Sequence, residues 1–235
     1  MCGRFTQRLS SSEFARIFDA RDLADGGGDA FNVAPTQPVT VILDRDGERV
    51  ADRFRWGLVP HWAKDLSRGG RLINARAETV ATSPVFRHSF RAKRCLIPAD
   101  GFYEWQRLPG GRQPYYIASL DGSPLTFAGI WSAWRDGSTG LTLLTCSIVT
   151  TTPNETMVPI HNRMPVILQR DAWATWLGST TDAGELGGLL RPSAADLVAV
   201  PVSSLVNSVR NQGAGLVVPV EPAPADPERM GESSY

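Results

Sequence analysis

The sequence is poor in cysteine: its 235 residues contain only Cys2, Cys95 and Cys146, and none of them lies in a Cys-x-x-Cys pair. An odd and sparse set without close spacing supports neither a disulfide framework nor a cysteine-based zinc site. No run approaches the roughly eighteen apolar residues that a membrane span needs, and the first residues lack the apolar segment of a secretory signal. We therefore expect a protein of the reducing cytoplasm, associated with the nucleoid if the source is bacterial, with no membrane contact.

The chain has no excess of either charge, because 24 lysine and arginine residues balance 24 aspartate and glutamate residues. This balance, together with a mean hydropathy of −0.15, argues against a disordered polyelectrolyte and a histone-like polycation. The charges are nevertheless uneven: residues 53–94 hold eight arginines and two lysines against Asp65 and Glu78, a net charge of +8. Such a segment predicts one basic face that attracts a polyanion, with a solvated surface as the alternative interpretation.

Short strand-like runs separated by turns dominate the sequence. The runs at 39–43 and 49–54 flank Asp44-Arg45-Asp46-Gly47 and predict a hairpin. Further strands are expected at 94–98, 115–120, 125–131, 141–150 and 164–168. Because most connections are too short for helical crossovers, the pattern favours an α+β fold, a single domain with a mainly antiparallel, curved or barrel-like β core flanked by short helices.

Helices are expected at 10–20, 83–90, 154–160 and 171–177. In the first of them, Ser10 and Glu13 have capping-box spacing, and Phe14, Ile17 and Phe18 share one face. The length favours one domain, which we assign to residues 2–220. Residues 221–235 carry three prolines and few apolar side chains, so they predict a disordered tail.

Cys2 can carry unusual chemistry, because a small side chain at position 2 permits removal of Met1 and leaves an α-amine beside a thiol. An α-amine has a reference pKa of about 7.7–8.0, so roughly a quarter of it is unprotonated near pH 7.4. The amine can condense with an aldehyde to a Schiff base, and the thiolate can then close a five-membered thiazolidine ring. The alternative interpretation is a cysteine that merely follows the start codon.

Three polar residues lie in otherwise apolar or strand-like segments: Asn74, Glu104 and His161. Each taken alone is as readily a structural residue, since a lone histidine is often only hydrogen-bonded and a glutamate on a strand often points to solvent. A metal site made of Cys2, Glu104 and His161 is a further alternative, but no close histidine pair or other ligand spacing supports it. We therefore expect no metal and no cofactor.

Seven short segments have a characteristic order and spacing, and together they extend over nearly the whole chain before the tail. They are Met1-Cys2-Gly3-Arg4-Phe5, Asn32-Val33-Ala34-Pro35-Thr36, Arg55-Trp56-Gly57-Leu58-Val59-Pro60, Ile73-Asn74-Ala75-Arg76-Ala77-Glu78-Thr79, Gly101-Phe102-Tyr103-Glu104-Trp105, Ile160-His161-Asn162-Arg163-Met164-Pro165 and Asn211-Gln212-Gly213-Ala214. Together they resemble the SOS-response-associated peptidase family, whose members sense abasic sites in DNA and cross-link to them. The resemblance implies a compact β-rich domain, a positively charged groove for single-stranded DNA and an active site at the mature N-terminus.

The resemblance also implies a role for each catalytic candidate. Cys2 is the nucleophile that forms a stable thiazolidine cross-link to an abasic site and so shields the lesion. His161 protonates the sugar ring oxygen, and Glu104 takes protons from the α-ammonium during loss of water. Asn74 fixes the terminus by hydrogen bonding. The expected partner is single-stranded DNA with abasic sites, including those at junctions with duplex, bound by a monomer.

DNA contacts are expected from the matching arginines, which grip phosphates, and from two tryptophans, which stack on bases. These residues are Arg4, Arg76 and Arg163, and Trp62 and Trp105, with Thr150 and Thr151 as weaker phosphate-contact candidates. The remaining tryptophans are interpreted as core: Trp56, Trp131, Trp134, Trp173 and Trp176. Two residues depart from the family pattern, since His61 stands where a small or polar residue is expected and Pro84 replaces what is often a basic residue.

Two other functions stay open on the sequence. The family name implies a thiol peptidase in which Cys2 is the nucleophile and His161 the base, acting only to remove Met1 from the chain itself or on other proteins. The third hypothesis is a single-stranded DNA-binding module in which Cys2 has no chemistry. A covalent adduct that depends on Cys2 distinguishes the abasic-site cross-linker from the DNA-binding module, which forms none.

Overall fold

The structure is a computed structural model that describes residues 2–66 and 69–222; residues 1, 67–68 and 223–235 lie outside the described residues. The tail predicted at 221–235 falls outside them, apart from the exposed residues Glu221 and Pro222. Among the described residues, no helix combines the length and the apolar character that crossing a membrane requires.

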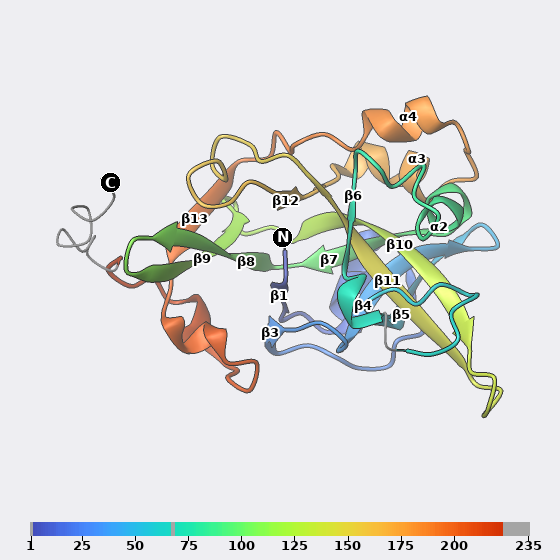
Figure 1. Cartoon of the computed structure of the whole chain (residues 1–235), viewed down its shortest axis with the longest axis horizontal. Coiled ribbons are helices and arrows are strands. Elements are labelled where there is room, and N and C mark those ends of the chain that lie inside the picture. Colours follow the sequence, from blue (N-terminus) through green and yellow to red (C-terminus); the bar gives the residue numbers. More distant parts are fainter. Residues whose placement is uncertain (1, 67–68, 223–235) are drawn as a thin grey trace, which may run out of the picture.

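A barrel of five strands forms the centre of the molecule (Figure 1). Its strands are β4 (Pro38–Arg45), β5 (Glu48–Trp56), β7 (Arg94–Ala99), β10 (Leu125–Arg135) and β11 (Thr142–Thr151). Strand β4 pairs with β5 and β7, β10 pairs with β7 and β11, and a parallel pairing of β11 with β5 closes the ring. The other four pairings are antiparallel, so the predicted mainly antiparallel, barrel-like core is confirmed.

The hairpin between β4 and β5 shows how local sequence sets this architecture. Arg45 lies opposite Glu48, so Asp46 and Gly47 form a two-residue loop. Both loop residues have left-handed backbones, with φ of 58° and 85°, which is the requirement of the hairpin turn whose twist matches the flanking strands. The predicted hairpin is therefore confirmed, and its strands are longer than the apolar runs at 39–43 and 49–54.

A second sheet lies beside the barrel and contains the N-terminal strand (Figure 1). Its order is β13 (Leu197–Pro201), β9 (Gly111–Ser119), β8 (Gly101–Leu108), β1 (Arg4–Gln7) and β3 (Ala30–Val33). Only Asp100 separates β7 from β8, so one stretch of chain passes from the barrel into this sheet. The Gln7 amide nitrogen donates to the carbonyl oxygens of Thr40 and Pro98, at 2.8 Å each, and so fastens β1 to two barrel strands.

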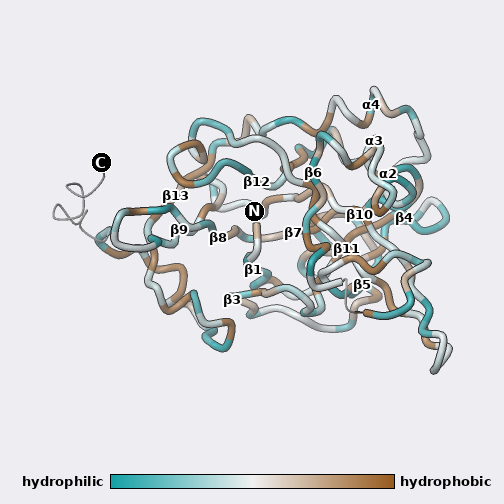
Figure 2. The backbone as a smooth tube through the Cα atoms, viewed as in Figure 1, coloured by the Kyte–Doolittle hydropathy of each residue, from teal (hydrophilic) through white to brown (hydrophobic). Residues whose placement is uncertain are grey.

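The apolar core has two main parts, one inside the barrel and one between its outer wall and the helices. Inside, Phe5 packs edge-on against Trp56 and Phe127, with ring centroids 4.9 and 6.0 Å apart. Outside, Phe18 stacks on Trp173 at 4.4 Å. Figure 2 shows hydrophobic residues gathered on the central strands and hydrophilic ones on the outer loops.

The remaining elements are α1 (Ser11–Phe18), α2 (Arg87–Ala92), α3 (Trp173–Leu177), α4 (Ala183–Gly188), β2 (Arg21–Asp22), β6 (Asn74–Arg76), β12 (Met164–Pro165) and the 3-10 turns η1 (Gly69–Arg71), η2 (Arg170–Ala172), η3 (Ser204–Asn207) and η4 (Ala214–Val217).

Helix α1 has the predicted capping box, because the Ser10 side chain accepts from the Glu13 N–H and the Glu13 side chain accepts from the Ser10 N–H. Of the three residues predicted to share one face, Phe14 and Phe18 are buried, whereas Ile17 is 37% exposed. With 100° between residues, the helix covers only a narrow apolar stripe, and Ile17 falls at its edge.

Two further sequence predictions were wrong. Residues 154–160 form turns instead of a helix, because the Asn154 side chain accepts from the Met157 N–H at 3.1 Å and Pro159 has no N–H to continue a helix. The strand predicted at 164–168 is only the two residues of β12, opposite Thr151 and Thr150 of β11. Beyond it the chain makes single bridges and turns away toward α3.

Candidate functional site

The second residue of the chain lies at the rim of the barrel, next to the start of β1. Strand β1 runs between β3 and β8, with Arg4 opposite Tyr103 and Phe5 opposite Val33. Cys2 is fully buried and belongs to the barrel core. Burial raises the pKa of the Cys2 thiol well above its usual range, and the negative charge of Glu104 adds to this shift. Because its pKa is raised, the buried Cys2 side chain is a neutral thiol near pH 7.

Asn74 reaches Cys2 from a different element. It begins β6, which runs parallel to β11 with Asn74 opposite Ile148. Its side-chain nitrogen donates to the Cys2 carbonyl oxygen at 2.8 Å. Its side-chain oxygen Oδ1 is buried and accepts no hydrogen bond in the described part of the chain. A buried amide oxygen without a donor is costly. Among the described residues, Asn74 therefore keeps an unused acceptor close to Cys2.

Glu104 and His161 complete this corner. Glu104 lies on β8 opposite Tyr115 and is 2% exposed. Burial raises the pKa of its carboxyl group, and nearby His161 partly opposes this shift. The two side chains approach to 3.9 Å between Glu104 Oε1 and His161 Nδ1. The structure therefore brings together all four catalytic candidates, which come from the N-terminus, β6, β8 and the loop after β11.

A tight turn holds the His161 ring. The Arg163 N–H lies 3.0 Å from His161 Nδ1, and the Arg163 carbonyl oxygen lies 3.2 Å from the same atom. The N–H can donate to Nδ1 of a neutral ring, which then has its proton on Nε2, whereas the carbonyl can accept from Nδ1 of a protonated ring. The backbone N–H and carbonyl groups of Arg163 can therefore hydrogen-bond to His161 Nδ1 in either protonation state of the ring.

The Arg163 side chain is anchored by Glu78, a residue to which sequence reasoning gave no role. The guanidinium donates to both Glu78 carboxylate oxygens, at 2.5 and 2.9 Å, and to the Thr150 carbonyl oxygen at 2.6 Å. Hydrogen bonds from Arg163 lower the pKa of Glu78. The pair ties the loop that carries His161 to the end of β6, which carries Asn74. In the sequence, the segment Ala77-Glu78-Thr79 after β6 was the only indication that Glu78 has a role.

Two expected DNA contacts, Arg4 and Trp105, lie next to each other beside Cys2. The Arg4 guanidinium lies 6.0 Å from the Trp105 ring and donates to Asn32 Oδ1 and the Val206 carbonyl oxygen, at 2.8 Å each. The Trp105 indole N–H donates to Asn207 Oδ1 at 2.7 Å. A groove of about 770 Å³ runs along this pair, lined also by Gly3, Pro35, Thr36 and Arg112.

The other expected contacts have different surroundings. Trp62 is 50% exposed, and Arg76 is also exposed. Thr150 and Thr151 are buried, and their hydroxyls donate to the carbonyl oxygens of Ala75 and Leu190 at 3.5 and 3.0 Å. The two threonines therefore help to pack β11, and DNA contact by them stays a prediction. Trp56, Trp134, Trp173 and Trp176 are buried, and Trp131 is partly buried.

Asn32 connects two of the segments that carry the family resemblance, the one that starts at Asn32 and the one that starts at Asn211. It is fully buried, and its side-chain nitrogen donates to the carbonyl oxygens of Val206, Ser208 and Asn211. The Gln212 side chain in turn accepts from the Phe31 and Asn32 N–H groups. These bonds hold the 204–212 loop, with Asn207, against Trp105. Sequence reasoning matched both segments but gave neither of them this role.

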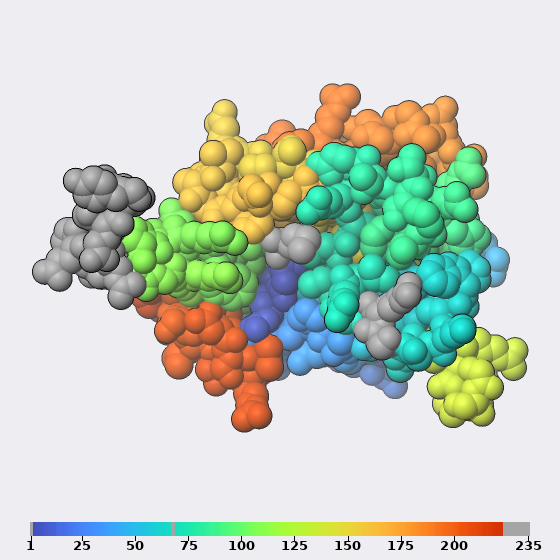
Figure 3. Space-filling view, viewed as in Figure 1, coloured from blue at the N-terminus to red at the C-terminus, as the bar shows by residue number. Residues whose placement is uncertain are grey.

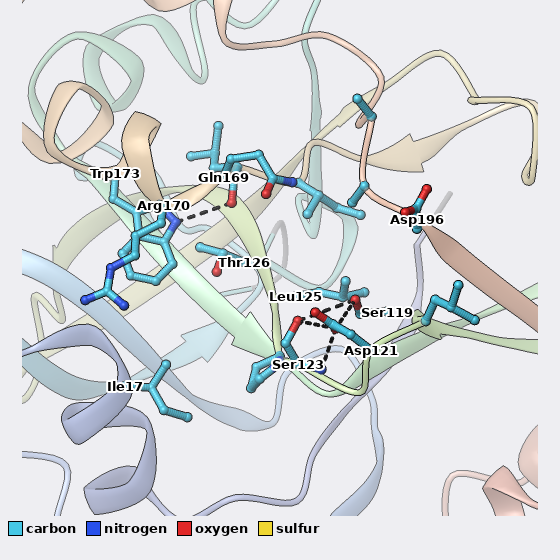
Figure 4. Close-up of a pocket in the computed structure, with 16 residues that line it drawn as sticks. Ile17, Ser119, Asp121, Ser123, Leu125, Thr126, Gln169, Arg170, Trp173 and Asp196 are labelled. Carbon is cyan, nitrogen blue, oxygen red and sulfur yellow. Dashed lines mark hydrogen bonds between the residues drawn. The ribbon is translucent and has the colours of Figure 1, made fainter.

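A different hollow, of about 660 Å³, lies between α1, the β9–β10 turn and α3 (Figure 4). Ile17 and Trp173 lie on one side of it, and Asp121 and Asp196 on the other. Hydrogen bonds from Ser123 and Ser119 lower the pKa of Asp121 to about 2, so this wall is anionic and suits DNA poorly. None of the four catalytic candidates lines it.

Across the described residues, no group of three or more histidine, cysteine or acidic side chains is placed to hold a metal ion.

Figure 3 shows how the face around the N-terminal strand is assembled from distant parts of the chain. The first residues come to the surface between the 100–115 region on one side and the 70–90 region on the other, with the 155–165 region above and the 205–215 region below. The last two of these regions carry His161 and Asn207. The 70–90 region belongs to the basic segment, which therefore lies directly beside the candidate site.

Comparison with known proteins identifies the family of the chain. The family model "SOS response associated peptidase (SRAP)" matches residues 1–209. "Abasic site processing protein YoaM" of Bacillus subtilis is 42% identical over 222 residues, which cover 92% of this chain and 97% of that protein. "Abasic site processing protein YedK" of Escherichia coli is 33% identical over 229 residues, which cover 94% and 100%.

The fold is also that of solved proteins. A crystal structure of a protein from Bacteroides thetaiotaomicron superposes with a TM-score of 0.86 at 25% identity, and the match covers 94% of this chain and 100% of that one. The sequence match, which spans nearly the whole described part of the chain, is therefore joined by a match in three dimensions. This chain belongs to the SOS response associated peptidase (SRAP) family.

Proposed function

We propose that this protein recognises abasic sites in single-stranded DNA and, once Met1 has been removed, binds them covalently through Cys2 as a thiazolidine. The observation that carries the proposal is the 2.8 Å hydrogen bond from Asn74 to the Cys2 carbonyl, beside the Glu104–His161 pair. Acid–base groups are thereby gathered around a residue that becomes an amine and a thiol when the preceding peptide bond is cleaved. The names of the relatives, abasic site processing proteins, support the same substrate.

Asn74 is placed to hold the reacting amine. Its Nδ2 is already bonded to the Cys2 carbonyl, and the α-nitrogen of the same residue lies within one residue's length of that bond. Oδ1, which accepts no bond among the described residues, can then accept from the amine after Met1 is lost. An amine held in one orientation attacks an aldehyde faster than a freely rotating one.

Glu104 and His161 supply and remove the protons. Burial raises the pKa of Glu104, so the carboxylate is a better base for the α-ammonium than an exposed glutamate. His161 in its protonated form can donate the Nε2 proton to the ring oxygen of the closed sugar, so that the imidazole becomes neutral and the C1′ aldehyde is released. Attack by the amine then expels one water and gives a Schiff base, and the Cys2 sulfur adds to its carbon to close the ring.

Closure by sulfur decides the outcome of the reaction. A Schiff base at C1′ acidifies the C2′ protons, and loss of one of them breaks the DNA strand. Addition of the Cys2 sulfur removes the iminium that drives this elimination, so the strand stays intact and the lesion is covered. A single cross-link per protein is the expected product, formed by lyase-like Schiff-base chemistry without strand cleavage.

The experiment is intact-mass spectrometry of the protein before and after incubation with a single-stranded oligonucleotide containing one abasic site. We expect a protein without Met1 that gains the oligonucleotide mass less one water. Borohydride separates the two possible linkages, because it adds two hydrogens to a Schiff base and leaves a thiazolidine unchanged. Cys95→Ala is the matched control, since Cys95 is equally buried but lies in the barrel wall.

Cys2→Ala gives the decisive result. We expect it to form no adduct while it retains weak binding of the same oligonucleotide. An equally stable adduct in Cys2→Ala contradicts the thiazolidine, because the linkage then needs only the α-amine. No adduct in a wild-type protein that has lost Met1 also contradicts the proposal and leaves a non-covalent DNA-binding module. The same spectra test self-processing, because Met1 retained only in Cys2→Ala indicates an autopeptidase, whereas its loss from both proteins indicates removal by another enzyme.

A further inference from the structure

A small basic pocket lies apart from Cys2, between the segment after β5 and helix α2. It has a volume of about 250 Å³, and its lining includes His61, Trp62, Arg87 and His88 above the buried serines Ser89 and Ser132. The two residues that depart from the family pattern, His61 and Pro84, both line it. No residue of this lining is acidic.

The imidazole and guanidinium donors of this pocket make no ion pair within residues 2–66 and 69–222. The two imidazole rings lie side by side, with centroids 5.4 Å apart and planes tilted by 57°. A neutral imidazole donates one N–H and a protonated one two, and a guanidinium offers a planar set of donors that matches a phosphate. The pocket therefore suits a small oxyanion.

Two neighbouring imidazoles can also hold a transition metal, but this pocket favours an anion. A metal site needs further ligands, and no histidine, cysteine or acidic side chain in the described chain joins the pair to make a group of three. The Arg87 guanidinium in the same lining repels a cation.

The pocket lies a few nucleotides from the candidate site. Its floor residue Ser132 is opposite Thr145, whereas Asn74 is opposite Ile148, three residues further along β11. At about 3.4 Å per residue this is a shift of roughly 10 Å along the strand, a separation that a few nucleotides of one DNA strand can span. Helix α2 and the N-terminal strand are visible on the same face (Figures 1 and 3).

We propose that this pocket binds a backbone phosphate of the DNA strand that carries the lesion, with the half-exposed Trp62 ring at its edge stacking on an adjacent base. The inference rests on the proposed function, because it needs DNA across the Cys2 corner. His61, His88 and Arg87 together take one phosphate, which fixes the register of the strand relative to Cys2.

The test measures binding of abasic single-stranded DNA to the full chain with Cys2→Ala, so that affinity is read without cross-linking. The pocket variants are His61→Ala/His88→Ala and Arg87→Ala; the control is Arg45→Ala, whose side chain pairs with Asp52 on the β4–β5 hairpin. We expect the pocket variants to raise Kd about three- to tenfold and to lower the slope of log K against log salt by about 0.7, the value for one phosphate of a single strand. Arg45→Ala leaves both unchanged.

A scan of the DNA locates the contact independently of any change to the protein. Replacing phosphates one at a time by neutral methylphosphonates gives one flanking position, a few nucleotides from the lesion, that weakens binding by the same factor. In His61→Ala/His88→Ala, neutralising that phosphate has a smaller effect than in the wild type, because the variant has already removed part of the same contact and only Arg87 is left. Additive losses at every position, or an unchanged salt slope, overturn the phosphate assignment.

Two further outcomes separate this inference from others. If Zn²⁺ alone binds the wild type tightly, and EDTA weakens DNA binding by the wild type but not by His61→Ala/His88→Ala, the pocket is a metal site and the proposal is wrong. If the wild type forms the Cys2 adduct and the pocket variants bind like wild type, the proposed function stands and only the pocket proposal fails. If the wild type without Met1 forms no adduct, the proposed function fails whatever the pocket does.

Discussion

The barrel wall and the corner around Cys2 share strands but treat their polar groups in opposite ways. In the wall, apolar side chains fill the inside and backbone groups pair between neighbouring strands. The corner buries Cys2 and Glu104, whose pKa values are both raised. It also buries the Oδ1 atom of the half-buried Asn74, which has no donor among the described residues. The stable wall offsets the cost of burying polar groups at the corner.

This difference predicts that mutations in the wall change stability and that mutations in the corner change chemistry. It follows from the general trade-off between a stable fold and an active site that holds polar groups in costly surroundings. Each variant below is therefore measured in two ways, by thermal unfolding and by the rate of adduct formation with abasic single-stranded DNA.

Glu104→Gln is expected to have the largest effect. The rate of adduct formation falls by about 10²–10⁴-fold, the usual contribution of a general base. Glu155→Gln, an exposed glutamate before His161, serves as the control and leaves the rate unchanged. A rate within threefold of wild type for Glu104→Gln would show that Glu104 moves no proton in the slow step.

The same variant is expected to be more stable at neutral pH. Because burial raises the folded-state pKa of Glu104, the unfolded chain releases its proton at lower pH than the folded one, and folding becomes less favourable as pH rises between the two pKa values. Glu104→Gln lacks this penalty, so its Tm exceeds that of the wild type by about 2–4 °C at pH 7 to 8, which corresponds to about 1 kcal/mol. The gain disappears below the pKa of an unfolded glutamate, near 4.3. An unchanged Tm at every pH would contradict this account.

Arg94→Met tests the wall side of the comparison. Arg94 is 6% exposed and donates to backbone carbonyls at the ends of α2 and α3, including those of Phe90 and Trp176 at 2.8 and 2.6 Å. Methionine has similar bulk but no donors, so several buried carbonyls lose their partners and the free energy of unfolding falls by about 3–5 kcal/mol. Chemical denaturation measures the loss, and folded protein is expected to cross-link at the wild-type rate. A slower rate in the folded variant would mean that the wall also tunes the corner.

Gly129→Ala is a smaller test of packing inside the wall. An added Cβ would lie 2.7 Å from the Cys95 sulfur and 2.9 Å from Ile97 Cδ1, so these side chains must move, at a cost of about 1–3 kcal/mol. Gly137→Ala, in the turn between β10 and β11, meets nothing within 4 Å and is the matched control. Equal denaturation midpoints for the two variants would show that the barrel interior has spare room.

Glu78→Gln is expected to give the smallest change. The variant weakens the anchor of Arg163, and the turn that supports both protonation states of His161 becomes looser, so the adduct rate falls about three- to tenfold. Nitrogen NMR of the His161 ring distinguishes this from a general loss of structure, because the Nδ1 signal reports the hydrogen bonds between the ring and the Arg163 backbone. Glu48→Gln, which removes an exposed partner of Arg21, changes neither readout, and the same result for Glu78→Gln would show that the anchor has no influence on His161.

Much of the fold could be predicted from local patterns because they act over a few residues. Asp46-Gly47 sets the β4–β5 hairpin through its left-handed backbone, and Ser10 with Glu13 caps α1. The helix predicted at 154–160 failed because the Asn154 side chain and Pro159 favour turns over helical hydrogen bonds. Composition alone did not predict that β11 pairs in parallel with β5 and closes the barrel, since such a pairing depends on residues about 90 positions apart.

The sequence by itself determined which chemistry is available: an N-terminal cysteine, an amide, a carboxyl and an imidazole, together with a basic segment and the family they indicate. Only the tertiary structure decided that Asn74 meets the Cys2 carbonyl, that Glu104 meets His161 and that Glu78 anchors Arg163. Spacing along the chain does not predict such contacts, because Asn74 and Cys2 are 72 positions apart and Arg163 and Glu78 are 85 positions apart. The physical reason is that burial, and with it the raised pKa values of Cys2 and Glu104, exists only once β1, β6 and β8 have packed around one rim of the barrel.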